Sequence, residues 1–394
     1  MLALLLATVT VSAAFEGGSV GKVEYLAPNH IRCAVRGQAD QNHRNRQASW
    51  YYFRLDGLPQ GEFQIDFVDL VGEYNFHPGS HAITRNTRPV FSYDNQTWTH
   101  FRDDQASWSE SEVRLTLRFK PERSPIWIAH VAPYTGRELQ RLLAIRDPRM
   151  QQETIGKSVH GRDIALLTIT DPAVAAAGKH VVWLMGRQHA WEAGTSWVAD
   201  GAVRFLLSRD PAALRLRRST IFKVMPIFDP DGVAEGTVRF NANGYDNNRN
   251  WDTADPKLMP EIAAARRSML SWLDAGHPID IFLTLHNTEA KDYVEGPVNL
   301  GILAIDRTAG ELVQCLRSGT NFHDPASPRE SIGHAPIDKG RLTVNQYLFR
   351  ERHVAAFLME LMVERHPALG RLRTAQDFTA FGEGLAKCLA GSVP

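Results

Sequence analysis

The hydrophobic pattern changes its period near residue 134, and this change restricts the chain to two folding units of different class. Before that point, short runs such as residues 49–55 and 113–119 alternate apolar and polar side chains between polar turns. Period-two alternation with frequent turns is typical of an antiparallel β-sandwich. After it, short apolar runs alternate with helix-like stretches, as in an α/β sheet with helices on both faces.

We therefore predict an all-β antiparallel sandwich domain at residues 15–134 and an α/β domain at residues 135–394, whose mixed sheet is mostly parallel. Strands of the sandwich are expected at 49–55, 62–67, 113–119 and 125–131. In the second domain, strands are expected at 181–185, 221–228, 279–285 and 355–360, and helices at 196–207, 260–275 and 375–389.

The charges of the chain balance, because 44 Lys and Arg residues stand against 44 Asp and Glu residues. Without a basic excess, neither nucleic acid nor an anionic membrane is expected as a partner. No later stretch is long and uncharged enough to span a bilayer in the mature chain. The three cysteines (Cys33, Cys315 and Cys388) cannot all pair, and they argue against a disulfide scaffold or a cysteine zinc site. No feature of the sequence defines an oligomeric state.

The first fourteen residues form an uncharged apolar run that ends in Ala13 and Ala14. Such a run closing on small residues is typical of a signal peptide, although no Lys or Arg precedes it. We therefore predict a signal peptide at residues 1–14 and export to the periplasm or the medium. The alternative is a buried first strand in a cytoplasmic protein.

Two His-x-x-Glu pairs, His189 with Glu192 and His286 with Glu289, follow the predicted strands 181–185 and 279–285. Side chains three apart on a helical turn share a face, so each pair could point at one metal ion. Two neighbouring strand ends would bring His189, Glu192 and His286 together. Three nitrogen and oxygen ligands with an open fourth position form a catalytic zinc site, so the pattern predicts one Zn²⁺ ion and hydrolysis.

Further motifs lie between the two pairs: Pro-Asp-Gly at residues 230–232 and Asp-x-Asn-Arg-Asn-Trp at residues 246–251. In this order the motifs resemble the zinc carboxypeptidase family, and within it the cytosolic carboxypeptidase-like branch. Residues 50–54 and 133–135 are similar to the β-sandwich that precedes the catalytic domain in that branch. The resemblance implies the zinc carboxypeptidase fold and a peptide or protein C-terminal tail as substrate.

The resemblance also implies roles for single residues. His189, Glu192 and His286 would be the zinc ligands, and Asp246 would accept the free N–H of a ligand imidazole. Asn248 and Arg249 would hold the terminal carboxylate of the substrate, the arginine through two parallel hydrogen bonds.

The same resemblance implies that Arg239 would stabilise the oxyanion and that Glu360 would be the general base. Glu364, in a polar stretch, and Glu289 are weaker candidates for the base. Tyr347, thirteen residues before Glu360, would be the tyrosine that covers the substrate, although its surroundings depart from the family pattern.

Substrate preference and alternative functions remain open at this point. Four basic residues in the region that lines the specificity pocket of relatives suggest a preference for acidic C-terminal residues: Lys339, Arg341, Arg350 and Arg352. One alternative is a zinc amidohydrolase of the aspartoacylase or desuccinylase type, which acts on small acylated amino acids. The other is an inactive peptide- or glycan-binding protein, against which the complete set of site residues argues.

Overall fold

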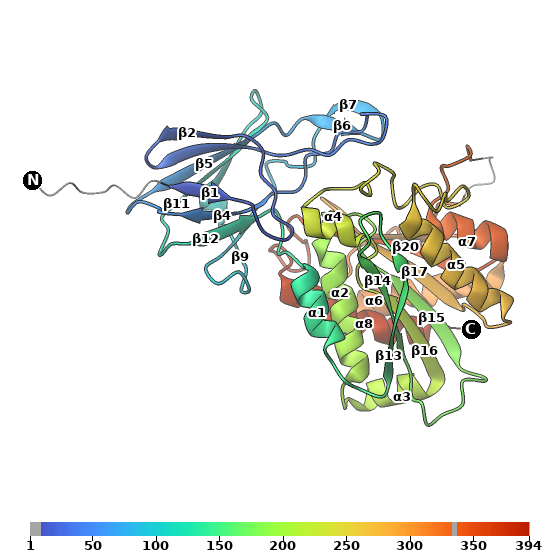
Figure 1. Cartoon of the computed structure of the whole chain (residues 1–394). Coiled ribbons are helices and arrows are strands. Elements are labelled where there is room, and N and C mark those ends of the chain that lie inside the picture. Colours follow the sequence, from blue (N-terminus) through green and yellow to red (C-terminus); the bar gives the residue numbers. More distant parts are fainter. Residues whose placement is uncertain (1–8, 333–336, 394) are drawn as a thin grey trace, which may run out of the picture.

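The computed structural model describes residues 9–332 and 337–393, which form an all-β domain followed by an α/β domain (Figure 1). The last strand of the first domain is β12 (Ile126–Ala129), and α1 (Gly136–Leu143) begins the second. A capping box explains the start of α1, because Thr135 and Glu138 each bind the other's backbone N–H. The predicted domain boundary at residues 134–135 falls in this short connection.

Two five-stranded sheets face each other in the first domain of the described chain. Buried side chains alternate along β5 (Phe63–Val68), where Phe63, Ile65 and Phe67 all point into the core. The all-β antiparallel sandwich is confirmed, with one parallel pair among its strands: β3 (His30–Ala34) runs parallel to β5. Between β3 and β5 the chain passes through the other sheet as β4 (Tyr52–Asp56). It then re-enters the sheet that contains β3 as β5, which runs in the same direction as β3.

The remaining strands of this domain are short. In sheet order, the first sheet is β1-β4-β12-β8-β9 and the second is β10-β11-β5-β3-β2, while β6 and β7 form a separate hairpin. Their bounds are β1 (Thr10–Ser12), β2 (Val23–Ala27), β6 (Gly72–Tyr74), β7 (His77–Ser80), β8 (Val90–Ser92), β9 (Thr99–His100), β10 (Ala106–Ser109) and β11 (Arg114–Phe119).

The predicted signal peptide lies partly outside the described residues, which begin at Val9. Val9 is buried, and β1 pairs antiparallel with β4 at the edge of the first sheet. Cleavage after residue 13 or 14 would therefore remove a paired strand. The signal peptide stays a prediction.

A mixed eight-stranded sheet forms the centre of the second domain as described, in the order β13-β14-β16-β15-β17-β20-β18-β19. The central neighbours β16-β15-β17-β20 are parallel, and antiparallel pairs flank them. The strands are β13 (Met150–Lys157), β14 (Asp163–Ile169), β15 (His180–Met185), β16 (Thr220–Met225), β17 (Ile281–Thr288), β18 (Tyr293–Gly296), β19 (Arg329–Glu330) and β20 (Ala356–Met362).

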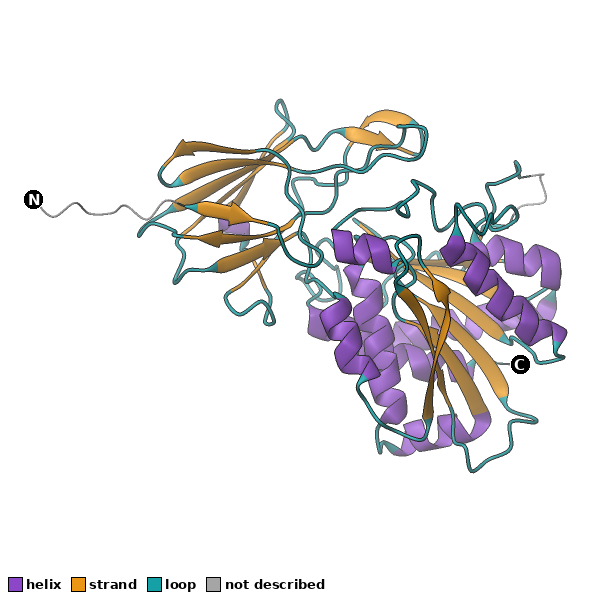
Figure 2. Ribbon diagram, in the orientation of Figure 1, coloured by secondary structure: helices purple, strands orange, loops and turns teal. Residues whose placement is uncertain are grey.

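Helices cover both faces of this sheet, as predicted (Figure 2). Along β15, Val182 and Leu184 pack into one apolar core with α2, α6 and α8, whereas Val181 and Trp183 pack into another with α5 and α7. In the described chain, no helix is long and apolar enough to cross a bilayer. The remaining helices are α2 (Ala193–Leu207), α3 (Pro211–Ser219), α4 (Pro230–Glu235), α5 (Pro260–Asp274), α6 (Leu303–Gly319), α7 (Val344–Arg352) and α8 (Ala375–Gly391).

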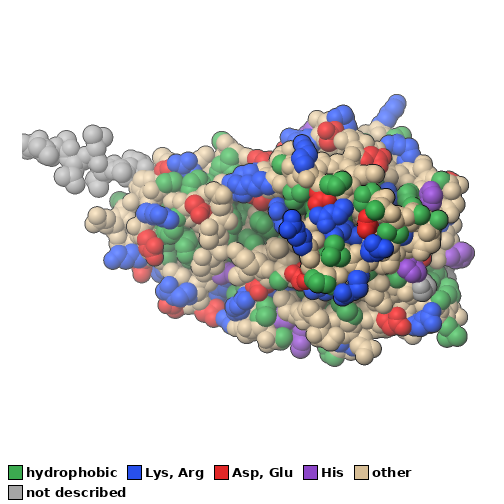
Figure 3. All heavy atoms as spheres, turned by 90° about the horizontal axis from the view of Figure 1, so that it is seen from below, with side chains coloured by type: hydrophobic (Ala, Val, Ile, Leu, Met, Phe, Trp, Pro, Cys, Tyr) green, Lys and Arg blue, Asp and Glu red, His purple; other side chains and the backbone are tan. Residues whose placement is uncertain are grey.

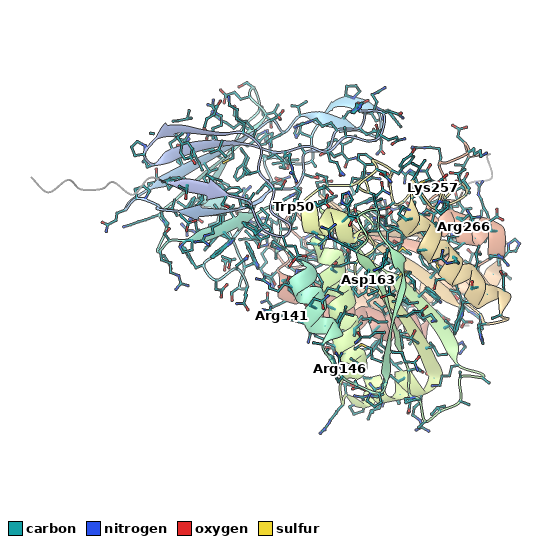
Figure 4. All side chains as sticks on the ribbon, in the orientation of Figure 1. Trp50, Arg141, Arg146, Asp163, Lys257 and Arg266 are labelled. Carbon is teal, nitrogen blue, oxygen red and sulfur yellow. A yellow bond between two sulfur atoms is a disulfide. The ribbon has the colours of Figure 1, made fainter. Side chains whose placement is uncertain are left out.

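The two domains share an apolar core. Trp50 and Tyr52 of the sandwich belong to the same buried cluster as Leu139 of α1 and Val198 of α2. Figure 4 labels Trp50 where the domains meet. A disulfide between Cys315 and Cys388 joins α6 to α8, and Cys33 is buried as a free thiol.

Both acidic and basic side chains are distributed over the molecular face seen from below (Figure 3). This mixture agrees with the zero net charge of the sequence.

Candidate functional site

Two neighbouring parallel strands bring the predicted metal ligands together. His189 follows β15, and His286 lies within β17, which pairs with β15. Glu192 lies between the two imidazoles, with Oε1 2.8 Å from Nδ1 of His189 and Oε2 3.0 Å from Nδ1 of His286. One ligand atom from each residue lies within 4.8 Å of the other two, and all three residues are buried.

The loop between β15 and α2 holds its shape through a buried arginine. Arg187 has a left-handed backbone (φ 61°) and donates to the carbonyl oxygens of Ala190 and Tyr134 at 2.7 and 3.2 Å. Glu192 occupies the N-cap of α2, but its carboxylate does not cap the helix and faces the imidazoles instead. Helix α2 therefore begins without a side-chain cap, and the Glu192 carboxylate is available as a candidate metal ligand.

The outward nitrogen of each imidazole faces an oxygen acceptor. Nε2 of His189 lies 3.0 Å from Oδ1 of Asp246, and Nε2 of His286 lies 3.1 Å from Oε1 of Gln188. Gln188 is fully buried and also accepts a hydrogen bond from the hydroxyl of Thr284 at 2.6 Å. With a metal ion bound in the cluster, these acceptors would take the N–H at Nε2 of each ring and leave the Nδ1 lone pairs for the ion.

The donor set fits the predicted zinc ion. Two imidazole nitrogens and one carboxylate oxygen are ligands that zinc prefers, and three protein ligands leave a fourth position for reaction chemistry. Burial alone would raise the pKa of Glu192, but the two histidines outweigh it and hold that pKa at about 2. The carboxylate is therefore an anion, as a ligand must be.

A second group with metal-like spacing has a different explanation. His160, Asp231 and Glu235 lie close together, but Arg162 donates to Asp231 at 2.6 Å and to Glu235 at 3.1 Å. Ser158 also donates to Asp231 at 2.7 Å. Arg162 already pairs with both carboxylates, so we assign the cluster to structure.

Glu360 lies beside the ligands because of strand register. It is the partner of His286 in the parallel pair β17–β20 and of Tyr293 in the antiparallel pair β18–β20. Within the described residues its Oε2 is buried without a hydrogen-bond partner. Burial, and then the nearby Glu192 carboxylate, raises the pKa of Glu360 well above its ordinary value.

A cavity of about 460 Å³ opens over these groups. Its wall includes the two histidines, the predicted catalytic residues Glu360 and Arg239, and the predicted substrate-binding residues Asn248 and Arg249. Arg239 donates from Nε to Oδ2 of Asp246 at 2.8 Å, so Asp246 links this arginine to His189. Arg239, followed by His189, keeps the pKa of Asp246 well below its ordinary value although burial opposes the shift.

Hydrogen bonds to the backbone hold the two substrate-binding candidates, Asn248 and Arg249. Asn248 is buried, and its Oδ1 accepts the N–H of Val344 at 3.2 Å. Arg249 donates from Nη1 to the carbonyl of Asn248 at 2.7 Å. Both side chains therefore lie at the cavity wall, and each is held there by a hydrogen bond to the backbone.

The structure does not bring Tyr347 to the cavity. Its side chain is only 4% exposed and packs in the core beneath α7, with its ring centroid 6.5 Å from that of Trp251 and Arg266 stacked above it. Residue 347 lies on a helix whose apolar face covers the sheet, so the tyrosine points inward. The tyrosine that lines the cavity is Tyr293 of β18.

The basic residues of the predicted specificity region separate in space. Arg341 lines the main cavity and, with Lys339, a smaller adjoining cavity of about 250 Å³. Arg352 instead pairs with Asp274 at 2.9 Å, and Arg350 donates to the carbonyl of Ile332 at 2.8 Å.

Several cavity residues carried no recognisable signal in the sequence. Glu295 and Tyr293 lie on β18, a short strand without a long apolar run, and Asn75 comes from the tip of the β6–β7 hairpin in the first domain. Gln188 could have been found from its position directly before His189. The rival base Glu289 does not belong to the described cavity lining, and burial raises its pKa to about 7.

Comparison with known proteins gives two family matches along the chain. Residues 137–290 match the zinc carboxypeptidase family, and residues 11–131 match the cytosolic carboxypeptidase N-terminal domain. Cytosolic carboxypeptidase 1 of Gallus gallus is 25% identical over 294 residues, which cover 66% of this chain and 24% of that protein. The chain thus spans about a quarter of the length of that relative.

Solved structures share the fold over the whole chain. A metallo-carboxypeptidase from Burkholderia cenocepacia superposes with a TM-score of 0.83 at 24% identity, covering 98% of both chains. A metallo-carboxypeptidase from Pseudomonas aeruginosa, solved in complex with (2-guanidinoethylmercapto)succinic acid, gives a TM-score of 0.81 at 22% identity and covers 97% of this chain and 98% of that one. Both domains and their arrangement therefore have known counterparts.

Proposed function

We propose that the chain is a zinc-dependent metallocarboxypeptidase, because residues 137–290 match the zinc carboxypeptidase family and residues 11–131 match the cytosolic carboxypeptidase N-terminal domain. Its substrates would be peptides or protein tails with a free C-terminus. The observation that carries the proposal is that both histidines of the His189–Glu192–His286 cluster line one cavity together with Glu360 and Arg249. Neither alternative function is favoured by a specific contact.

The proposed roles follow from the position of each side chain. Bound by His189, Glu192 and His286, a zinc ion would polarise a carbonyl and acidify a water molecule. Glu360 would take a proton from the attacking water and deliver it to the leaving amine, because its side chain lines the cavity beside the histidines and its Oε2 has no hydrogen-bond partner among the described residues. Arg239 would donate hydrogen bonds to the oxygen that gains negative charge.

Arg249 and Asn248 would select the chain terminus. Only the last residue of a peptide offers a carboxylate next to the scissile bond, and a guanidinium binds a carboxylate through two parallel hydrogen bonds. A lysine at position 249 could not reproduce this geometry.

A peptide series with free and amidated C-termini tests the proposal, together with the zinc content of the purified protein. We expect about one zinc per chain, release of the last residue from free peptides, and no cleavage of the amidated ones. Arg249→Ala should raise KM for free peptides, and Arg249→Lys should restore only part of the loss. Equal cleavage of amidated peptides would contradict the proposal, and hydrolysis of N-acetylaspartate without peptidase activity would favour the amidohydrolase.

We further propose that acidic C-terminal residues are preferred and that Arg341 is the cation responsible, because it is the member of the predicted basic set that lines the main cavity. Glu295 lines the same cavity, so the charge is mixed. Matched peptides ending in Glu, Lys and Phe test this point. Glu should be released fastest, Arg341→Ala should remove the advantage, and a preference for Phe or Lys would contradict the proposal.

The proposed location is outside the reducing cytoplasm. The Cys315–Cys388 disulfide supports export, because such bonds persist in oxidising compartments. The name of the Gallus gallus relative fits the alternative, a cytoplasmic location. Fractionation of cells that produce the full chain distinguishes the two, and recovery of the protein only in the cytosol would contradict export.

A further inference from the structure

A glutamine of the N-terminal domain, Gln38, is joined to the catalytic domain by four hydrogen bonds. Its Oε1 accepts the backbone N–H groups of Val238, Arg239 and Phe240 at 3.0, 2.6 and 2.9 Å. Its Nε2 donates to the carbonyl of Phe240 at 2.7 Å. One side-chain amide thus satisfies three successive N–H groups and one carbonyl in a segment outside the helices and strands.

The same segment touches the metal-ligand loop and carries Arg239. The carbonyl of Val238 accepts the N–H of Trp191, which stands between His189 and Glu192, at 3.0 Å. Arg239 is therefore held twice: Gln38 fixes its backbone, and Asp246 accepts from its guanidinium at 2.8 Å. A side chain fixed at both ends is already oriented for the cavity that it lines.

We propose that Gln38 is a positioning residue for Arg239, and that through it the N-terminal domain completes the active site. The inference rests on the proposed carboxypeptidase function, in which Arg239 acts on charge that develops in the transition state. Loss of an interaction made only in the transition state lowers kcat and leaves KM nearly unchanged. A displaced Arg239 should therefore show itself in kcat.

A neighbouring residue supplies a matched control. Arg36 also crosses between the domains, and its Nη2 donates to the carbonyls of Glu235 and Gly236 at 2.8 and 3.1 Å. These contacts hold the end of α4 and do not involve residues 238–240. A variant at Arg36 thus measures domain docking without the contact to the Arg239 segment.

The experiment measures kcat and KM on a peptide with a free C-terminus for the full-length variants Gln38→Met, Gln38→Glu and Arg36→Met. Gln38→Met keeps the length of the side chain but loses all four hydrogen bonds, and it should lower kcat by at least about tenfold with KM within about threefold. Gln38→Glu keeps an oxygen for the three N–H groups but loses the donor to the carbonyl of Phe240, so it should recover only part of the loss. Arg36→Met should retain kcat within about twofold.

A double variant separates positioning from a general structural effect. If Gln38 acts through Arg239, adding Gln38→Met to Arg239→Ala should cost little further activity, because coupled residues are not additive. Zinc content and circular dichroism of each variant identify an unfolded chain, in which case Gln38→Asn, one methylene shorter, replaces Gln38→Met.

The outcomes are distinguishable. A wild-type kcat for Gln38→Met, an equal loss for Arg36→Met, or a full additional loss in the Arg239→Ala chain would each overturn the positioning role while leaving the carboxypeptidase function intact. A wild-type chain with zinc bound that cleaves no peptide would instead remove the proposed function and, with it, this inference.

Discussion

At the residue scale, Glu360 is distinguished from the rival bases Glu289 and Glu364 by its position beside His286 in the sheet register and by an Oε2 atom buried without a hydrogen-bond partner among the described residues. Glu360→Gln keeps the size of the side chain and removes the proposed base. We expect kcat to fall by about 10²–10⁴-fold with the zinc content unchanged, as measured by steady-state kinetics and metal analysis. Glu289→Gln is the control and should stay within a few-fold of wild type; substantial activity of Glu360→Gln would refute the assignment.

A second residue-scale prediction concerns the stability of the fold at low pH. Asp292 is buried and accepts from both terminal nitrogens of Arg373 at 2.7 and 2.6 Å. Burial alone would raise the pKa of Asp292, but Arg373 outweighs it and lowers that pKa to about 2 from 3.8. A depressed carboxyl pKa stabilises the fold above the unfolded value, and the contribution is lost as the pH falls toward the folded value.

Urea unfolding at pH 6 and at pH 2 measures this contribution. The wild-type chain should lose about 2 kcal/mol of unfolding free energy through this one carboxyl, and Asp292→Asn should lack that part of the pH dependence. The control Asp163→Asn, which removes an exposed ion pair with Lys157, should keep the full pH dependence of the unfolding free energy. An unchanged pH dependence in Asp292→Asn would contradict the prediction.

The sequence could identify candidate site residues only where neighbouring residues along the chain form one motif. His189 and Glu192 share one turn, and Asp246, Asn248 and Arg249 share one loop, so spacing and motif were informative. The sequence did not reveal that the side chain of Tyr347 points into the core, because the sheet under α7 determines which face of the helix is buried. Tyr293 and Glu295 reach the cavity only through the pairing of β18 with β20, a contact that no local pattern encodes.

At the element scale, the disulfide between α6 and α8 is the bond whose removal is easiest to measure. It closes a loop of 73 residues, for which chain entropy predicts about 4 kcal/mol of stabilisation. Replacing Cys315 and Cys388 together by alanine should lower the free energy of unfolding by an amount near this value. Cys33→Ala is the matched control and should leave the effect of reductant unchanged.

Thiol titration of the denatured chain checks the pairing itself. Without reductant one thiol should react, and with reductant all three. Three reactive thiols without reductant would contradict the bond.

Elements with a strong periodic signal were predicted best. The predicted strands at 181–185 and 279–285 correspond to β15 and β17, and the predicted helix at 260–275 corresponds to α5. The strand predicted to run to residue 228 ends at Met225, because Pro226 cannot donate to a ladder. The parallel pairing of β3 with β5 was missed, since it depends on the path of the chain between the sheets.

At the scale of the whole molecule, the shared core predicts that the two domains unfold together. Trp50 is 3% exposed, donates to the carbonyl of Gly17 at 3.0 Å and packs at the domain junction (Figure 4). Calorimetry should give one transition for the wild-type chain. Trp50→Ala should lower its midpoint without splitting it, at a cost of about 3–5 kcal/mol. Trp108→Ala, at the outer edge of the sandwich, should cost less, and two separate transitions would contradict the prediction.

Because Gln38 of the sandwich binds the segment around Arg239, the sandwich cannot be freely exchanged between relatives. A sandwich taken from a relative would dock on the α/β domain through apolar surfaces that tolerate substitution. It would still need an amide of the correct length opposite residues 238–240. More of these chimeras should therefore fold than show activity. An active chimera would have to take the glutamine and the segment that it binds from the same parent.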